Sequence, residues 1–483
     1  MKIWKKRFGL CLAVFLLVLF QPLTAHAAND TPFVPWEPEE ETSFYYGRNA
    51  LAELPNSTAL LYAYDAIAAG IESSAETITV WNGTNALSEA ELELVMDTYR
   101  RDYAHHFWLG DAYSYTQVQE TGNIYDLIPG YSVGEDFVAG YLLSGEELTA
   151  AQDAFEQEID DILAGADADW NDFEKELYFH DLLADRVTYT EATHAHNAYG
   201  ALVEGEAVCE GYAEALQVLL HRAGIPSYLV TGWSDNPATG APEGHEWNVV
   251  CIDDAWYHVD ATWDDQGDTL FHAYFNLTDA MIEADHIIEE TPYDLPGCTS
   301  DAANYFTVKG GKVTAFDVAQ LSLLMKEKGL TIHVWLEGNE TTVEEYLAEY
   351  ADQNNLWQLI ELMGATNVTS YSYAALGREM VLHLEGELPE VPEGISAAAR
   401  ELSDNRVYVT VTGNLGGEAA DLFVAVYDAD GRMIGIAAEQ DFTALTAGIA
   451  FTVPFDGAAD SVGVFALNDD GVPYVDAVLC GIE

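Results

Sequence analysis

The feature that most constrains the fold is a helix with a cysteine in its first turn, followed by a strand and a β-hairpin. The helix is expected after the glycine-bearing loop at Gly205, carries Cys209 in its first turn and is stopped by Gly224 and Pro226. Apolar side chains recur at three- and four-residue steps along it, which predicts one buried face. A buried helix beside antiparallel strands indicates an α+β domain.

The position of Cys209 suits a nucleophile. Unpaired backbone N–H groups and the positive end of the helix dipole favour thiolate over thiol at a helix N-terminus. The same N–H groups can stabilise the oxyanion that forms when a sulfur attacks a carbonyl. Cys209 is therefore the first candidate catalytic residue.

The hairpin supplies a base and a group to orient it. His245 begins one strand, Asp253 and Asp254 make the turn, and Asp260 ends the returning strand. Counted from the turn, the positions of His245 and Asp260 differ by about two residues, close enough for an Asp–His hydrogen bond across the pair. Such a bond fixes the imidazole tautomer and supports an ion pair with a thiolate. We therefore predict a triad of Cys209, His245 and Asp260.

These residues resemble the transglutaminase-like superfamily, relatives of the papain-like cysteine proteases, in its secreted bacterial multidomain branch. The resemblance depends on the segments Val208–Tyr212, His245–Asn248 and Trp256–Trp263, with support from Tyr199–Leu202, Tyr274–Leu277 and Asp285-His286. It implies a papain-like core, a Cys-His-Asp triad and protein or peptide substrates. The family contains both hydrolases and acyltransferases. The triad chemistry needs no metal or cofactor.

The oxyanion hole is less well defined by the sequence. Papain-like enzymes place a glutamine shortly before the cysteine, whereas this chain has Glu204 and Glu206 there. Besides the Cys209 N–H, the remaining candidates for oxyanion or substrate contacts are Tyr199, Asn197, Tyr212 and Trp247. Carboxylates around the sulfur, those of Glu206, Glu210 and Glu246, would disfavour a thiolate by repulsion.

The first 27 residues have the pattern of a signal peptide. Basic residues precede an uncharged apolar run from Phe8 to Phe20, and Ala25-His26-Ala27 supplies a cleavage site. The run is too short for a membrane span, which needs roughly 20 residues. We therefore expect a secreted, extracellular protein, with cell-surface association open, and no membrane span after cleavage.

The charge is strongly acidic, with 82 acidic and 18 basic residues and a formal net charge of −64. A surface of this sign repels nucleic acid and anionic membranes. Solubility is the simpler explanation for the charge, and attraction of cationic substrates is the other.

The length and the composition shifts predict several domains. Residues 28–164 are expected to form a mainly helical region, 165–300 the catalytic domain, 301–386 a small α+β domain and 395–483 a C-terminal Ig-like β-sandwich. Helices are expected at Ser57–Ile71, Ser88–Arg101, Glu146–Leu163, Asp317–Lys328 and Thr342–Met363, and a core strand through Phe107–Leu109 to Tyr115.

Metal sites are not favoured by the spacing. Asp167–Asn171 starts like a calcium loop but lacks the required glycine and the terminal glutamate. The remaining histidines show no regular set of zinc ligands, and His180 falls on an apolar helical stripe typical of a structural histidine. Four cysteines follow the signal segment, and a bridge between Cys251 and Cys298 stays open.

Two functions from different classes follow. The first is a cysteine enzyme that cleaves or transfers acyl groups, with hydrolysis favoured over transfer to an amine. The alternative is a catalytically inert module that keeps the fold for surface binding. Sugar hydrolysis by paired carboxylates is a third class, but among 82 acidic residues no pair stands out.

Overall fold

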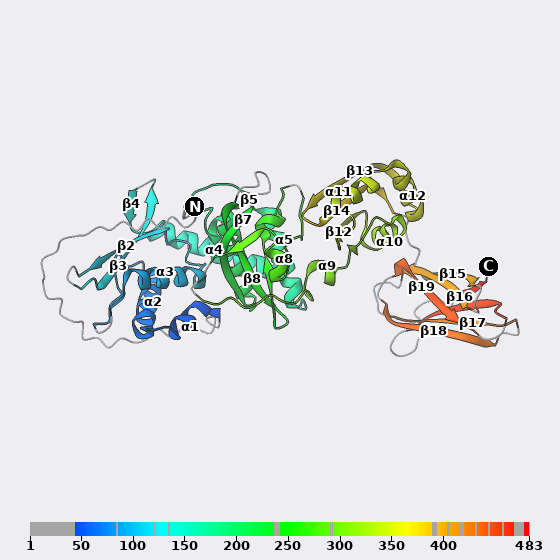
Figure 1. Ribbon diagram of the computed structural model, residues 1–483, viewed down its shortest axis with the longest axis horizontal. Coiled ribbons are helices and arrows are strands. Elements are labelled where there is room, and N and C mark those ends of the chain that lie inside the picture. Colours follow the sequence, from blue (N-terminus) through cyan, green and yellow to red (C-terminus); the bar gives the residue numbers. More distant parts are fainter. Residues whose placement is uncertain are drawn as a thin grey trace. The chain divides into compact units, whose positions relative to one another are not determined.

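The computed structural model describes residues 44–482, with gaps at 84–85, 119–120, 134–135, 236–241, 268, 290, 292, 389–393, 403–405, 415–419, 430–431, 443–444, 456–457 and 468–477. The expected signal peptide, residues 1–27, lies outside this part. Among the described residues, no helix combines the length and apolarity that crossing a membrane requires. The chain divides into two compact units, Met1–Val308 and Lys309–Glu483, which are described separately (Figure 1).

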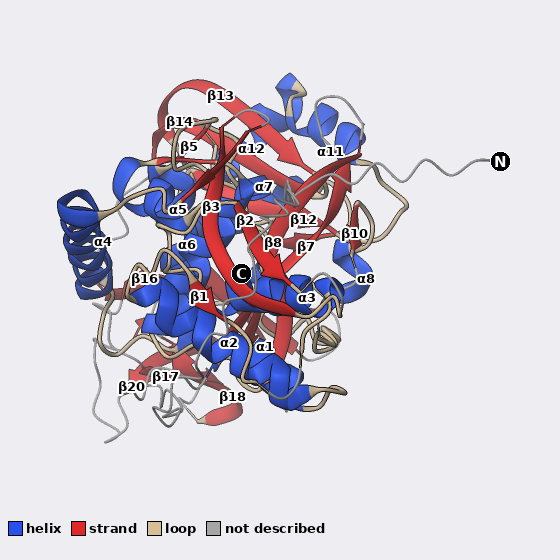
Figure 2. Cartoon of the chain, turned by 90° about the vertical axis from the view of Figure 1, so that its left-hand side faces the viewer, coloured by secondary structure: helices blue, strands red, loops and turns tan. Residues whose placement is uncertain are grey.

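The first part of unit 1 combines helices with a small antiparallel sheet. Its elements are α1 (Tyr46–Ala52), α2 (Ser57–Glu72), β1 (Ile78–Thr79), α3 (Glu89–Asp102), β2 (Ala112–Gln117), β3 (Ile124–Val133), β4 (Asp136–Ala139) and α4 (Gly145–Gly165). Helices α1, α2 and α3 pack against one another (Figure 2). A capping box between Ser88 and Glu91 fixes the start of α3.

A small four-stranded sheet accompanies the helices of this region. Strands β1, β3 and β2 pair in that order, and β4 pairs with β3. The expected core strand begins only at Ala112, while Phe107 and Trp108 lie in a turn and are buried. Because the first four residues of β2 are all buried, the alternation that marks a half-exposed strand is absent from its sequence.

The second part of unit 1 contains the predicted helix and hairpin. Its elements are α5 (Asp172–Arg186), β5 (Thr188–Tyr189), the π-helix η2 (Gly200–Glu204), β6 (Glu206–Ala207), α6 (Cys209–Arg222), β7 (Ser227–Asp235), β8 (Pro242–Ile252), β9 (Ala255–Val259), α7 (Ala261–Asp264), α8 (Asp279–Ile282), β10 (His286–Ile288) and α9 (Tyr305–Val308). The turn between β8 and β9 is made by Asp253 and Asp254 with φ of 50° and 63°. Two such residues are typical of a type I′ hairpin, which sets the register of the pair.

The sheet of this part has the order β10-β7-β8-β9 and is antiparallel throughout. On one face of this sheet, His286 of β10 reaches Asp260, which follows β9. Gly232 of β7 carries no side chain on this face. A Cβ there would lie 2.1 Å from the Ile287 carbonyl oxygen and 2.8 Å from the Trp247 ring. From α3, Arg101 donates hydrogen bonds to the Leu229 carbonyl and to Thr231 of β7.

Unit 2 begins with a mixed sheet and three helices. These elements are β11 (Lys312–Val313), α10 (Val318–Lys328), β12 (Thr331–Leu336), α11 (Val343–Tyr350), α12 (Gln353–Met363), β13 (Thr366–Leu376) and β14 (Glu379–Glu387), with strand order β11-β12-β14-β13. The single helix expected at Thr342–Met363 is two helices, because Asp352 accepts hydrogen bonds from two backbone N–H groups and caps a new one.

The rest of unit 2 is all strand. Its elements are β15 (Gly394–Leu402), β16 (Arg406–Asn414), β17 (Ala420–Tyr427), β18 (Met433–Phe442), β19 (Leu445–Pro454), β20 (Ser461–Leu467) and β21 (Val478–Gly481). They form two antiparallel sheets, β15-β16-β19 and β18-β17-β20-β21. Alternate residues of both sheets, such as Val409 and Val424, are buried in one shared core.

Candidate active site

Cys209 is the first residue of α6, and the preceding loop holds it there. The Val208 N–H donates to the Ala195 carbonyl at 2.9 Å, and β6 pairs with β5 just before it. Gly211 packs so tightly that a Cβ would lie 2.5 Å from the Ala195 oxygen. The first N–H groups of α6 have no partner within the helix, so they are available to an anion near the sulfur.

His245 and Asp260 form the expected pair. The His245 Nε2 atom lies 2.6 Å from Asp260 Oδ2, and both side chains are buried. Asp260 Oδ1 accepts hydrogen bonds from the backbone N–H groups of Thr262 and Trp263, which makes Asp260 the N-cap of α7. The carboxylate is thus held on both oxygens and fixes the imidazole. With Nε2 directed at Asp260, Nδ1 is the ring nitrogen left to exchange a proton with a thiol.

The Cys209 sulfur lies against β8, next to the backbone of the residue that follows His245. The backbone N–H of Glu246, the residue after His245, hydrogen-bonds to it, and the charge of Asp260 also acts on it. Burial, then the charge of Glu210, raises the pKa of the Cys209 thiol to about 12. An isolated thiolate is therefore disfavoured. Transfer of the proton to His245 forms an ion pair without net charge, so burial opposes it less.

Two of the carboxylates expected to repel a thiolate are partly compensated. Glu210 hydrogen-bonds to His196, and this contact raises the pKa of His196 to about 9, so that the pair is charge-balanced near neutral pH. Burial, then the charge of Glu210, raises the pKa of Glu246 to about 8. Glu246 is thus largely protonated at pH 7. Less negative charge faces the sulfur than the sequence suggested.

A second histidine shares Asp260 with His245. His286 Nε2 lies 3.1 Å from Asp260 Oδ2, and His286 Nδ1 lies 2.6 Å from Asp285 Oδ1. The Tyr274 hydroxyl donates to Asp285 Oδ2 at 2.6 Å. The sequence drew attention to Asp285-His286 through the family resemblance, but it gave no signal for this role.

Aromatic rings enclose the imidazoles. Trp247 lies parallel to the His245 ring with centroids 5.9 Å apart and meets the His286 ring edge-on at 5.1 Å. Trp263 lies 6.0 Å from the His245 ring and 4.8 Å from the His286 ring. These rings exclude water from the pair and strengthen its electrostatic interactions. Of the weaker candidates, only Trp247 contacts a triad residue.

The other weak candidates have partners elsewhere. The Tyr199 ring stacks on Phe107 with centroids 4.7 Å apart, within the hydrophobic core. The Tyr212 hydroxyl donates to the Val187 carbonyl and contacts Asp265. The Asn197 side chain bonds to the backbone of Phe107 and Gly200. In the structure these groups stabilise the loop and helix around Cys209 rather than facing its sulfur.

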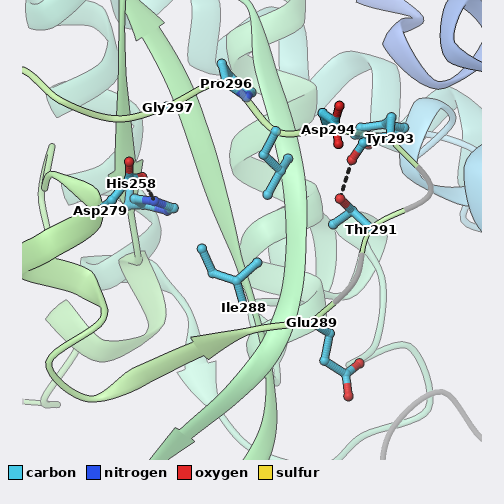
Figure 3. A pocket seen from close by; sticks show the side chains of 10 residues that line it. His258, Asp279, Ile288, Glu289, Thr291, Tyr293, Asp294, Pro296 and Gly297 are labelled. Atoms are coloured by element: carbon cyan, nitrogen blue, oxygen red, sulfur yellow. Dashed lines mark hydrogen bonds and ion pairs between the residues drawn. The ribbon is translucent and has the colours of Figure 1, made fainter.

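A cavity of about 550 Å³ is lined by residues of β9, α8, β10 and the segment that follows β10 (Figure 3). Its lining residues are His258, Asp279, Ile288, Glu289, Thr291, Tyr293, Asp294, Leu295, Pro296 and Gly297. The lining includes neither Cys209, His245 nor Asp260; its His258 accepts a hydrogen bond at Nδ1 from the Trp247 Nε1–H, at 3.1 Å. In Figure 3 His258 and Asp279 lie together on one side of the pocket, and Tyr293 and Asp294 lie on the other. The cavity is a candidate site for part of a substrate.

Among the described residues of unit 1, three clusters bring possible ligand atoms within 4.8 Å of one another: His180, Asp181 and His272; His245, Asp260 and His286; His258, Asp279 and Cys298. Hydrogen bonds already engage several of their ring nitrogens. His258 Nδ1 accepts from an indole, which can only donate, so the proton is on Nε2 and faces Asp279. His180 and His286 each meet carboxylates through both ring nitrogens. These rings have no lone pair free for a metal.

The four described cysteines are free thiols. Cys298 is buried, and burial with the charge of Asp279 raises its pKa above the ordinary value. Cys251 also has a raised pKa through burial and then the charge of Asp254. Cys209 differs from both in lying at a helix N-terminus beside an Asp–His pair.

We expect the free energy of unfolding to be highest at mildly acidic pH. Burial raises the pKa of Glu176 to about 8. Burial opposes the charge of His180, but Asp181 and Asp264 outweigh it and raise its pKa to about 10. Both folded-state values lie above the unfolded ones, roughly 4.3 and 6.5, so their stabilisation is lost as pH rises through them. The pKa values of Asp181 and Asp260 are held well below the ordinary range by their histidine partners, against the effect of burial, so their stabilisation is lost below about pH 4.

Urea unfolding between pH 4 and 10 measures this profile. Glu176→Gln keeps the polar contact with Asn276 and should flatten the decline between about pH 4.3 and 8. Stability that rises steadily from pH 5 to 9 would contradict the assignment.

The sequence of this region matches a known family. Residues 159–261 match the model of the transglutaminase-like superfamily, and the segment contains Cys209, His245 and Asp260. No curated protein matches the chain.

Two solved structures show weaker likeness. A structure described as a TGase is 14% identical over 42% of this chain and 53% of its own, with a TM-score of 0.21. The alignment thus spans about half of that protein. A β-glucuronidase from Ruminococcus gnavus in complex with D-glucuronic acid is 17% identical over 22% of this chain and 17% of its own, with a TM-score of 0.14. Since both TM-scores are low, the family assignment depends on the matched segment, and the chain carries a mixed α/β domain of the transglutaminase-like superfamily over residues 159–261.

Proposed function

We propose that this protein is an exported cysteine enzyme that cleaves or transfers acyl groups of peptide or side-chain amide bonds. The observation that carries the proposal is the buried 2.6 Å contact between His245 and Asp260, with the Cys209 sulfur on the adjoining backbone. The proposed signal peptide supports the export. An inert binding module would have no need for a buried histidine held in one tautomer beside a helix-terminal cysteine.

The proposed reaction uses each triad residue once per half-reaction. His245 takes the thiol proton of Cys209 as the sulfur attacks the substrate carbonyl carbon and forms a C–S bond. The negative oxygen is stabilised by N–H groups of the first turn of α6. The intermediate collapses, the C–N bond breaks, and His245 gives its proton to the leaving amine. Asp260 holds the His245 ring in the same orientation through both half-reactions.

The second half-reaction regenerates the enzyme. A water molecule or an amine attacks the thioester carbon while His245 accepts its proton. The C–S bond then breaks and the sulfur takes that proton back. We favour water as the acceptor. The aromatic rings of Trp247 and Trp263 surround His245, and the acceptor that they admit decides between hydrolysis and amine transfer.

A product analysis tests the function. The mature chain is incubated with a peptide library, with and without a primary amine, and the products are read by mass spectrometry. Peptide cleavage or deamidation indicates hydrolysis, while an amine adduct on glutamine indicates acyl transfer. We expect hydrolysis products that disappear after alkylation of Cys209. No product in either condition, together with Cys209 that is alkylated no faster at pH 7 than an ordinary thiol, would favour the inert binding module.

A further inference from the structure

Asp260 meets a second imidazole besides that of His245. The His286 side chain is fully buried, and each of its ring nitrogens lies within hydrogen-bond distance of a carboxylate, that of Asp260 or that of Asp285. An ionised carboxylate can only accept hydrogen bonds. An imidazole that donates from both nitrogens carries two protons and a positive charge.

We propose that His286 is a positioning residue of the triad, an imidazolium that is clamped between Asp260 and Asp285 and sets the charge that Asp260 presents to His245. This inference rests on the proposed function, because it assigns His286 a part in the same reaction. His286 does not touch the substrate in this scheme. It acts through Asp260.

The surroundings of His286 favour the charged ring. Burial alone would lower its pKa, but hydrogen bonds to Asp260 and Asp285 outweigh burial and raise it to about 9. The Tyr274 hydroxyl fixes Asp285 from the other side. The titratable groups around the ring are Asp260, Asp285, Tyr274, His245 and His258. The aromatic rings of Trp247 and Trp263 also pack against the His286 ring.

The charge of His286 has a chemical consequence at the triad. Its ring centroid lies 5.4 Å from that of His245. A carboxylate favours the protonated form of an imidazole bonded to it. A neighbouring cation makes every deprotonation at the site easier, that of the Cys209 thiol and that of the His245 imidazolium alike. The positive charge of His286 therefore offsets the negative charge that Asp260 presents to His245.

The variant His286→Gln tests this role, because glutamine can still donate one hydrogen bond to Asp260 but carries no charge. The limb of kcat/KM that follows His245 should move to higher pH by roughly half a unit or more, the shift for unit charges 5.4 Å apart even with full water screening. The pH profile of Cys209 alkylation by iodoacetamide should move in the same direction. His221→Gln is the matched control. It changes a histidine at the far end of α6, about 18 Å from Cys209 along the helix axis. The pH profile of this variant should not move.

A direct measurement on the unmodified protein keeps the inference falsifiable if His286→Gln does not fold. Imidazole ¹H–¹⁵N spectra should show both ring nitrogens of His286 protonated at pH 7, with deprotonation only near pH 9. In Asp285→Asn that deprotonation should occur at lower pH. A neutral His286 ring at pH 7, or an unshifted alkylation profile in His286→Gln, would overturn the inference. Absence of turnover with normal His286 spectra and a shifted alkylation profile would instead refute only the proposed function.

Discussion

Replacing Cys209 by alanine is expected to abolish turnover, with kcat/KM reduced by a factor on the order of 10⁴ or more. In the proposed mechanism the sulfur is the atom that bonds to the acyl group, and the structure offers no second nucleophile beside His245 among the residues described there. Cys209→Ser should be nearly as inactive. Burial that already raises the pKa of the thiol would oppose ionisation of a hydroxyl even more.

Two matched variants separate this chemistry from packing. Cys298→Ala removes a buried thiol that lies outside the triad, and Cys251→Ala removes a partly exposed one. Both should keep kcat/KM within a few-fold. The free energy of unfolding of Cys209→Ala should change by about 1 kcal/mol, as for an ordinary small substitution. Turnover that survives in Cys209→Ser would contradict the sulfur mechanism and direct attention to paired carboxylates.

Local sequence signals predicted the part of the site that is local in the chain. The two-residue turn at Asp253 and Asp254 sets the β8–β9 register, and the register alone brings His245 to Asp260. The start of α6 followed from its glycine-bearing loop and apolar face. Helix bounds such as those of α2 and α3 followed from periodicity for the same reason.

The remainder depends on contacts that no local pattern encodes. His286 comes from β10, on the other side of β7 and β8 from β9, and its contact with Asp260 joins residues 26 positions apart in the chain. The raised pKa of Cys209 depends on how deeply the loop at Ala195 buries the helix terminus. Strand β13 was missed since nearly all of its side chains are exposed and it shows no alternation.

Asp260→Asn is expected to lower kcat by roughly 10³- to 10⁴-fold while leaving the protein folded, the size of effect known for the orienting aspartate of a serine-protease triad. All four partners of this carboxylate donate hydrogen bonds: His245 and His286 to Oδ2, and the N–H groups of Thr262 and Trp263 to Oδ1. The asparagine side chain has one oxygen and one NH₂ group. Its NH₂ group must therefore face either the two histidines or the two backbone N–H groups, all of which are donors. If it faces His245, the ring proton moves to Nδ1 and the base can no longer accept the proton of Cys209.

The alanine variant distinguishes orientation from packing. Asp260→Ala leaves the buried N–H groups of His245, of His286 Nε2 and of the α7 backbone without an acceptor, so it should lower the free energy of unfolding by about 3 to 5 kcal/mol, measured by urea denaturation. Asp181→Asn is the control, because Asp181 also holds two histidines, His180 and His272, but outside the triad. It should lose stability and keep kcat. If Asp260→Asn retains kcat within tenfold of the unmodified enzyme while Asp260→Ala unfolds, Asp260 serves only to hold the fold, since the imidazole then works without its orienting carboxylate.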